Sequence, residues 1–275
     1  MTYKLCLGTG MGFDIPTEEQ IRLIRKAGFD GFFTMAGEIE NLIEYARIGK
    51  EEGLIYQSLH APFGKMHIMW EGTEEEAEAV LAELKTCVDS CEKIGVDLLV
   101  CHVIIGMERC TPNEIGAERF RQLCEYAKEK NIKIAFENTE GEEYLAAVME
   151  KCSDLDNVGF CFDSGHEMCY NFSRDMRSLY GDRLFATHLN DNLGMKDEKI
   201  KTWHDDLHLL PFDGIADWEN IAERLKKSTC PECLTLELTV TNKPERNAND
   251  IYKEMSFSEY ISEAYIRAEK IKNLI

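Results

Sequence analysis

The sequence lacks long hydrophobic runs, a secretory leader and clusters of basic residues. No stretch approaches the ~18 consecutive apolar residues that a membrane-spanning helix needs. Residues 1–16 lack the apolar core of a signal peptide. The densest group of lysines, at 196–201, is interrupted by Asp197 and Glu198, so it offers no footprint for nucleic acid. We therefore expect no membrane partner, and the sequence disfavours a nucleic-acid partner.

Linkers and low-complexity segments are also missing. The 275 residues run on without a break in composition. This length is close to the ~250 residues typical of one (β/α)8 barrel. We therefore expect a single TIM-barrel domain over residues 1–275.

Positive charge is scarce as well. The chain has 31 Lys and Arg against 51 Asp and Glu, a formal net charge of −20, which repels phosphate backbones and anionic lipid. Its 11 cysteines, an odd number, are scattered through apolar segments. Such thiols indicate a reducing compartment rather than a disulfide framework. The sequence predicts a cytoplasmic protein and leaves the formation of a homo-oligomer open.

The sequence is rich in short apolar runs that alternate with amphipathic segments. Near-continuous apolar runs are expected for parallel strands covered on both faces; they lie at 4–10, 29–35, 54–60, 96–103, 132–138, 158–164, 183–189 and 234–240. Helical patterns occupy 17–27, 73–94, 113–130, 215–227 and 257–271. Strands alternating with helices in this way predict an α/β fold, a (β/α)8 TIM barrel with its active site at the C-terminal ends of the strands.

Carboxylates and imidazoles stand where these apolar runs end. The set comprises His60, His102, Glu137, Asp163, His166, His188, Asp206, His208 and Glu237. Divalent metals bind deprotonated carboxylate oxygens and neutral imidazole nitrogens that converge from several elements. Because the strand ends of a barrel share one face, the set predicts a metal site on that face.

The set divides by its chemistry. One group offers three carboxylates and one imidazole, an oxygen-rich site that suits Mn²⁺, Mg²⁺ or Co²⁺ and also permits Zn²⁺; it consists of Glu137, Asp163, His188 and Glu237. The other group is richer in nitrogen and consists of His60, His102, His166, Asp206 and His208. This second group would hold a further metal cluster or bind the hydroxyls of a substrate.

Six motifs resemble those of a known family: HAPF at 60–63, ENT at 137–139, FDSGH at 162–166, HLNDN at 188–192, DDLH at 205–208 and LELT at 236–239. Together they resemble the xylose isomerase-like TIM-barrel superfamily, which includes sugar phosphate isomerases and epimerases and also endonuclease IV. In its ketose 3-epimerase-like members, the residues matching Glu137, Asp163, His188 and Glu237 hold one metal ion. In its endonuclease IV-like members, three zinc ions use all nine positions.

The resemblance implies a metal-dependent isomerase or epimerase that acts on a small carbohydrate, free or phosphorylated. Glu137 and Glu237 would be its catalytic acid–base pair and would transfer a proton through a metal-stabilised ene-diolate. Two alternatives stay open: an endonuclease IV-like, zinc-dependent abasic-site endonuclease, and a sugar-binding barrel without turnover.

Two positions bear on the sugar. Some ketohexose epimerases place an arginine six residues past the histidine of the seventh strand, where this chain has Gly194. Such enzymes also hold the substrate with a carboxylate that matches Glu143, although an acidic residue is equally favoured at an exposed helix start. The sequence therefore predicts a substrate-binding role for Glu143 and argues against a ketohexose substrate.

Overall fold

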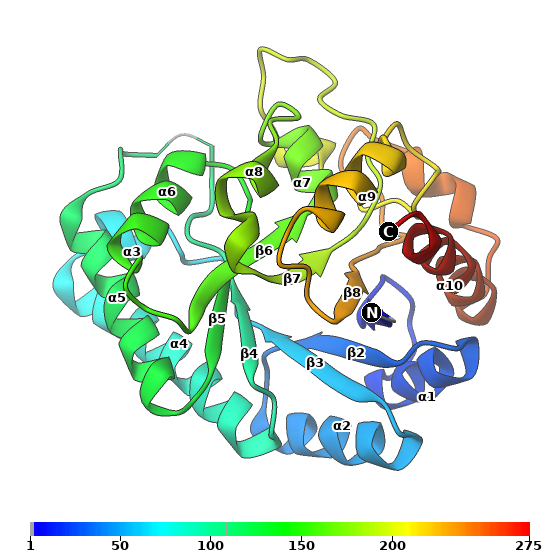
Figure 1. Cartoon of the computed structure of the whole chain (residues 1–275), viewed down its shortest axis with the longest axis horizontal. Helices are drawn as coiled ribbons and strands as arrows, with labels where there is room; N and C mark the ends of the chain where they lie inside the picture. The colour runs from blue at the N-terminus through cyan, green and yellow to red at the C-terminus, as the bar shows by residue number, and fades with distance from the viewer. Residues whose placement is uncertain (1–2, 108) are drawn as a thin grey trace.

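The computed structural model describes residues 3–107 and 109–275 and shows eight parallel strands ringed by helices (Figure 1). The strands are β1 (Lys4–Gly8), β2 (Gly31–Met35), β3 (Ile55–His60), β4 (Leu98–Cys101), β5 (Lys133–Glu137), β6 (Val158–Asp163), β7 (Leu184–His188) and β8 (Cys233–Leu236). Their order is β7-β6-β5-β4-β3-β2-β1-β8. A parallel bridge between Leu189 and Leu236 joins β7 to β8. The predicted (β/α)8 barrel is confirmed.

The α-helices are α1 (Thr17–Ala27), α2 (Ile39–Glu52), α3 (Ile68–Glu71), α4 (Glu74–Ile94), α5 (Glu114–Glu129), α6 (Glu142–Lys151), α7 (Ser164–Cys169), α8 (Met176–Tyr180), α9 (Trp218–Lys226) and α10 (Phe257–Leu274). Within the described residues there are also three short 3-10 helices: η1 (Gly181–Arg183), η2 (Trp203–Asp205) and η3 (Ala248–Tyr252). No helix in the described part of the chain is long and apolar enough to cross a membrane.

The helix starts follow from capping side chains. Thr73 accepts a hydrogen bond from the backbone of Glu76 at the start of α4, and Asn113 accepts one from Gly116 at the start of α5. The predicted helix at 215–227 begins three residues late, because Asp217 caps it by accepting a hydrogen bond from Asn220 N at 3.0 Å. The sequence patterns gave no separate prediction for α2 or α6.

The alternation of side chains along a strand explains why the polar groups face into the barrel. A small buried cluster consists of Leu98, Val100, Ala135, Cys161 and Ala186. Side chains two residues apart on a strand point the same way. Ala135 is followed two residues later by Glu137, Cys161 by Asp163, and Ala186 by His188. The strands therefore place these polar side chains above a layer of buried apolar side chains, at the C-terminal mouth.

The long segment between β7 and α9 is held by one buried carboxylate. Asp191 accepts hydrogen bonds from Phe212 N at 2.8 Å, from Ala216 N at 3.0 Å and from Trp218 Nε1 at 2.9 Å. The middle of this segment projects from the body as the yellow-green excursion at the top of Figure 1. Its return arm brings Asp206 and His208 back to the mouth of the barrel.

Candidate metal centre at the barrel mouth

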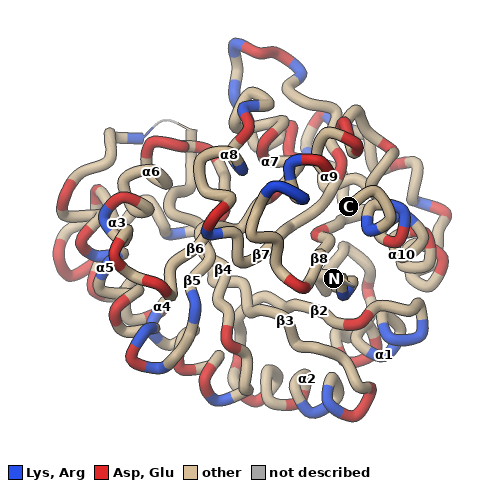
Figure 2. Tube along the Cα trace, in the orientation of Figure 1, with Lys and Arg blue, Asp and Glu red and all other residues tan. Residues whose placement is uncertain are grey.

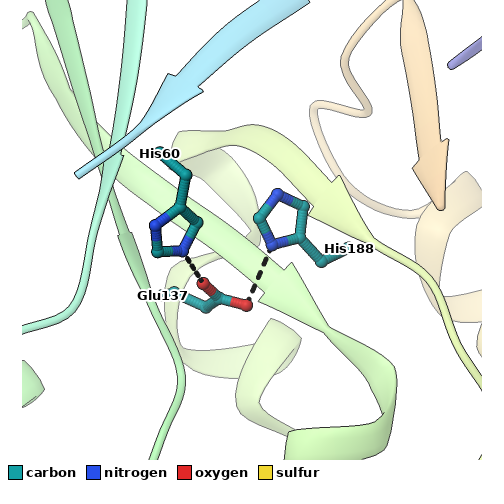
Figure 3. Close-up of side chains that lie close together, drawn as sticks. All are labelled: His60, Glu137 and His188. Atoms are coloured by element: carbon teal, nitrogen blue, oxygen red, sulfur yellow. Dashed lines mark hydrogen bonds and ion pairs between the residues drawn. The ribbon is translucent and has the colours of Figure 1, made fainter. Parts of the chain in front are cut away.

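Glu137 is the hub of the site. Its side chain is completely buried at the end of β5. Its Oε2 lies 3.2 Å from His60 Nε2, and its Oε1 accepts a hydrogen bond from His188 Nδ1 at 3.0 Å (Figure 3). The same Oε2 lies 3.2 Å from His102 Nε2. His166 Nδ1 is 3.5 Å from Oε1. Four of the histidines predicted from the sequence thus lie within 3.5 Å of one predicted carboxylate, that of Glu137.

The oxygen-rich group converges closely. One donor atom from each of Glu137, Asp163, His188 and Glu237 lies within 4.8 Å of the others. His188 Nδ1 is 3.0 Å from Glu137 Oε1 and also 3.2 Å from Glu237 Oε2. A single ring N–H cannot satisfy two carboxylates, and three carboxylates gathered in a buried site need a compensating cation. This donor set therefore fits a divalent metal ion that prefers oxygen ligands.

Asp163 is positioned by neighbours that the strand ends do not reveal. Its Oδ2 accepts a hydrogen bond from Asn190 Nδ2 at 2.8 Å, and its Oδ1 accepts one from His166 N at 2.6 Å, where Asp163 caps α7. Its backbone N–H donates to Asn138 Oδ1 at 2.8 Å. These contacts orient the carboxylate toward the centre, as supporting hydrogen bonds do around metal ligands.

Burial and charge push the carboxylate pKa values apart. Burial, reinforced by Glu137 and Glu237, raises the pKa of Asp163 to about 6 despite nearby histidines. Burial alone would raise the pKa of Glu237, but the charge and hydrogen bond of His188 outweigh it and lower the pKa to about 2. For Glu137 as well, His188 and the neighbouring imidazoles outweigh burial and hold the pKa well below its usual range. At neutral pH, both glutamates are therefore ionised bases.

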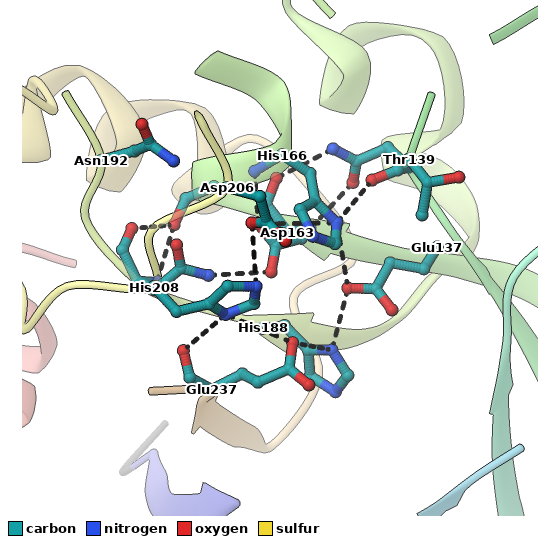
Figure 4. Close-up of polar contacts among 12 residues, drawn as sticks. Glu137, Thr139, Asp163, His166, His188, Asn192, Asp206, His208 and Glu237 are labelled. Atoms are coloured by element: carbon teal, nitrogen blue, oxygen red, sulfur yellow. Dashed lines mark hydrogen bonds and ion pairs between the residues drawn. The ribbon is translucent and has the colours of Figure 1, made fainter. Parts of the chain in front are cut away.

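Within the nitrogen-rich group, His166 and His208 are arranged around Asp206 (Figure 4), whereas His60 and His102 contact Glu137. His166 Nδ1 lies 3.0 Å from the carbonyl oxygen of Asn138, and His208 Nδ1 lies 3.1 Å from that of Glu237. Because a carbonyl only accepts, each Nδ1 carries the proton and donates. The Nε2 atoms of both rings face Asp206 Oδ1, at 3.4 Å from His166 and 2.9 Å from His208.

These groups open onto a cavity of about 480 Å³. Its lining includes His60, His102, His166, Asp206, His208 and Glu237 among the predicted residues. Glu137 lies beneath these histidines. Glu143 is exposed on the first turn of α6 and is not part of the lining that the structure describes, so it is not brought to the cluster.

Four polar residues of the cavity were not identified from the sequence: Thr139, Glu140, Tyr170 and Lys243. Thr139 and Glu140 follow Glu137 directly, so the end of β5 could have indicated them. Tyr170 follows the short helix α7, and Lys243 comes from the segment after β8. Neither stands at the end of an apolar run, so no strand-end pattern marks them.

A (β/α)8 barrel with carboxylates and imidazoles gathered at its C-terminal mouth defines a class of barrel proteins whose site offers the donor groups for a divalent metal ion. Within this class, residues 21–257 match the family model described as xylose isomerase-like TIM barrel, and the chain belongs to this family. The resemblance seen in the six sequence motifs is confirmed. A curated relative, the uncharacterized protein y4fM of Sinorhizobium fredii (strain NBRC 101917 / NGR234), is 30% identical, with 78% of each chain covered.

Solved structures show the same fold at low sequence identity. The IOLI protein with a bound zinc atom shares 19% identity, with 98% of each chain covered and a TM-score of 0.76. A D-psicose 3-epimerase with D-tagatose, from Clostridium cellulolyticum H10, shares 14% identity over 98% of this chain and 99% of its own, with a TM-score of 0.75. The chain spans only 42% of a fusion of a xylose isomerase-like TIM barrel with 4-hydroxyphenylpyruvate dioxygenase, at 18% identity.

Proposed function

We propose that this protein is a divalent-metal-dependent isomerase or epimerase of a sugar or sugar phosphate. The observation that carries the proposal is the convergence of Glu137, Asp163, His188 and Glu237 within 4.8 Å, at the base of a cavity of about 480 Å³. Membership of the xylose isomerase-like family supports it, as does the likeness in fold to a D-psicose 3-epimerase.

The metal would be held by the same four residues. Three carboxylates and one imidazole favour Mn²⁺, Mg²⁺ or Co²⁺, and Zn²⁺ also fits. When bound, such an ion stabilises the negative charge that develops on substrate oxygens as a neighbouring carbon loses its proton.

Glu237 is the base that a substrate can reach. Its side chain is 23% exposed and lines the cavity, and its low pKa keeps it ionised at neutral pH. The carboxylate would take a proton from the carbon next to the substrate carbonyl and become the acid. In an isomerisation, it returns that proton to the former carbonyl carbon, while the hydroxyl proton passes from the neighbouring oxygen to the former carbonyl oxygen. Positioned proton transfer of this kind contributes roughly 10²–10⁴-fold to the rate.

Glu137 is the partner for an epimerisation. In that reaction one carboxylate takes the proton, and the other, first protonated through a neighbouring imidazole, gives a proton to the opposite face of the same carbon. The pair then ends with its two protonation states exchanged. Glu137 is completely buried and is linked to the cavity through His60 and His102, which would carry protons between it and the bound sugar.

The nitrogen-rich group would orient the hydroxyls of the sugar. His166 and His208 each use Nδ1 on a backbone carbonyl, which fixes the ring and directs Nε2 to Asp206 at the cavity wall. These imidazoles and the Asp206 carboxylate offer donors and an acceptor to neighbouring hydroxyls. A substrate held at several such points reaches Glu237 in one orientation.

The cavity suits a sugar better than duplex DNA. Duplex binding depends on neutralising phosphates with Lys and Arg. Lys243 is the one Lys or Arg among the described residues that line the cavity. Along the chain trace, positions with Lys and Arg are interspersed with positions with Asp and Glu (Figure 2), and the net charge is −20. Abasic-site DNA, incubated with zinc-loaded protein, should therefore stay intact.

The test is proton exchange with solvent. The protein loaded with Mn²⁺ or Mg²⁺ is incubated in D2O with a panel of aldoses, ketoses and their phosphates, and deuterium uptake next to the carbonyl is followed by mass spectrometry. We expect uptake with wild-type protein and none with Glu237→Gln. Glu150→Gln, which changes an exposed glutamate on α6, is the matched control and should behave as wild type. An active Glu237→Gln variant contradicts the proposal, and absence of exchange with every sugar favours a barrel that binds without turnover.

A further inference from the structure

The cavity wall changes character between its floor and its mouth. The floor is polar and nearly inaccessible to solvent; its members include His60, His102, His166, Asp206 and His208. The mouth carries two exposed aromatic side chains, Phe63 at 38% and Trp203 at 51% exposure. Ile105 and Met107, both partly exposed, add to the same apolar rim. A ligand that fills the cavity therefore meets polar groups at one end and apolar groups at the other.

The size of the cavity exceeds what a monosaccharide at the metal centre would use. Its volume of about 480 Å³ lies in the ~300–1,000 Å³ range of pockets that bury drug-sized ligands. A single sugar ring in contact with Glu237 and the floor histidines would leave the rim exposed to water. Apolar surface gains stability when it leaves water. A substituent that extends outward from the sugar and covers the rim would therefore add to the binding free energy.

Trp203 is held in place rather than loose on the long β7–α9 segment. It opens η2, where the Thr202 hydroxyl caps the turn by accepting a hydrogen bond from His204 N at 3.3 Å. Lys243 Nζ lies 5.7 Å from the centroid of its ring, within the range of a cation–π contact. The same ammonium is 3.3 Å from Asp206 Oδ2. The indole is thus tied, through one lysine, to the polar floor of the same cavity.

Phe63 is fixed on a different element. It lies between β3 and α3 and stacks on the ring of His102, with centroids 4.6 Å apart and planes inclined by 20°. Phe63 and Trp203 therefore come from separate segments but border one cavity; His102 of the floor supports Phe63 directly, and Lys243 links Trp203 to Asp206 of the floor. Exposed aromatic side chains that are individually supported at the mouth of a polar cavity form a platform for a flat apolar ring.

We propose that the natural substrate is a glycoside with an aromatic aglycone and a ketone on its sugar ring, because the glycosidic bond blocks the anomeric carbonyl that the proposed proton transfer would otherwise use. The keto sugar reaches the metal centre, and the aglycone lies on the rim formed by Phe63, Ile105, Met107 and Trp203. This inference rests on the proposed function for the sugar end of the ligand. It goes further by assigning the outer part of the cavity to a second chemical group. Free monosaccharides then bind through the floor alone.

The tryptophans of this chain allow a direct test. The sequence has three, of which Trp70 and Trp218 are buried, at 3% and 4% exposure. Acrylamide quenching of the fluorescence therefore reports mainly on Trp203. Mg²⁺-loaded protein is titrated with phenyl glycosides of glucose, galactose and xylose, and with the corresponding free sugars. We expect at least one phenyl glycoside to lower the quenching constant about twofold or more, and the free sugars to leave it nearly unchanged.

Variants complete the experiment. Phe63→Leu, which keeps an apolar side chain against His102 but removes the aromatic ring, should weaken binding of that phenyl glycoside about tenfold and change the affinity for the free sugar much less. Ile215→Ala, an exposed change elsewhere on the β7–α9 segment, should alter neither. Equal protection of Trp203 by free sugars, protection by none of the phenyl glycosides, or equal losses for both ligands in Phe63→Leu overturns the inference. Deuterium uptake by free sugars in those cases would leave the proposed function standing. Loss of that uptake with Trp203 protection intact would reject the function alone.

Discussion

The amide of Asn190 occupies the space where a side chain on Gly165 would lie. A Cβ on Gly165 would be 1.9 Å from Asn190 Oδ1, while Asn190 Nδ2 donates to Asp163 at 2.8 Å. The glycine of the FDSGH motif is thus required by the amide that orients a candidate metal ligand. The need is for close approach, because the φ of Gly165 is not among the positive values of the chain.

The Gly165→Ala variant should therefore lose metal affinity. The added methyl group displaces Asn190, and Asp163 loses the hydrogen bond that fixes its Oδ2. Loss of such a supporting contact typically weakens metal binding by about 10–100-fold. Calorimetric titration with Mn²⁺ measures the effect. Gly37→Ala is the matched control because a Cβ there meets no atom within 4 Å. Unchanged affinity in Gly165→Ala would show that Asn190 does not support the centre.

Metal content should distinguish the two groups of side chains. Asp163→Asn removes an oxygen ligand from the oxygen-rich group and should reduce bound Mn²⁺ from about one ion per chain to nearly none. Asp206→Asn, in the nitrogen-rich group, should keep that ion, because Asp206 is not among the four converging ligands. Elemental analysis after dialysis gives the stoichiometry. Three zinc ions per wild-type chain, reduced by both substitutions, would support the nuclease-like arrangement instead.

Removal of the metal should lower the thermal stability of the protein. An ion that binds only the folded state stabilises it by RT ln(1 + [L]/Kd), about 2.7 kcal/mol at a hundred times Kd. Without the ion, the buried carboxylates of Glu137, Asp163 and Glu237 repel one another. We expect the Tm to fall on addition of EDTA and to recover with excess Mn²⁺. Asp163→Asn should show no recovery. A wild-type Tm that changes with neither EDTA nor Mn²⁺ would argue against a metal centre.

Metal affinity should also rise with pH. Because the pKa of Asp163 in the metal-free protein is raised to about 6, a proton competes for this ligand below that pH. The pKa of His188 is likewise raised well above its ordinary value, since Cys161, Glu137 and Glu237 outweigh burial. Each proton displaced makes the apparent affinity fall about tenfold per pH unit below the pKa concerned. Mn²⁺ titrations between pH 5 and 8 check this, and a flat profile would contradict it.

The same pKa shift has a consequence for the metal-free protein. A carboxyl group whose pKa is higher in the folded than in the unfolded chain binds its proton more tightly when folded, so its contribution to stability is lost as pH rises through the window between the two values. For Asp163 that window extends from about 4, the ordinary value of an aspartate, to about 6. Urea unfolding of the metal-free protein should show this loss, and Asp163→Asn should remove that part of the pH dependence.

Strand ends were the part of the site that the sequence could predict. An apolar run that stops at a carboxylate or histidine marks a side chain that shares its direction with a buried residue two positions earlier, as Ala135 does for Glu137. Glu143 was predicted to bind substrate only from its distance along the sequence to Glu137, and such spacing does not fix the direction of a side chain. Gly141, with a φ of 76°, turns the chain into α6, whose buried face carries Tyr144 and Leu145, so Glu143 faces solvent. The position of Lys243 in the cavity lining depends on the path of the segment after β8, which no local sequence pattern specifies.

Asp191 gives the last prediction, because one carboxylate organises that long β7–α9 segment. Asp191→Ala would leave the backbone N–H groups of Phe212 and Ala216 and the indole N–H of Trp218 without their acceptor. Each buried donor left unsatisfied costs about 1–3 kcal/mol. We expect the free energy of unfolding, measured with urea, to fall by roughly 3 kcal/mol or more.

Asp197→Ala is the control for this prediction, since Asp197 lies in the exposed excursion of the same segment, and surface changes usually stay within about 0.5 kcal/mol. One of the lost donors, Phe212 N, lies four residues after His208, so the Asp191 carboxylate fixes the arm that carries Asp206 and His208. If Asp191→Ala folds, Asp206 and His208 should therefore be displaced while the oxygen-rich group stays, so Mn²⁺ binding persists and deuterium exchange falls. Equal losses of both would mean that the segment supports the whole mouth of the barrel rather than its sugar-binding side.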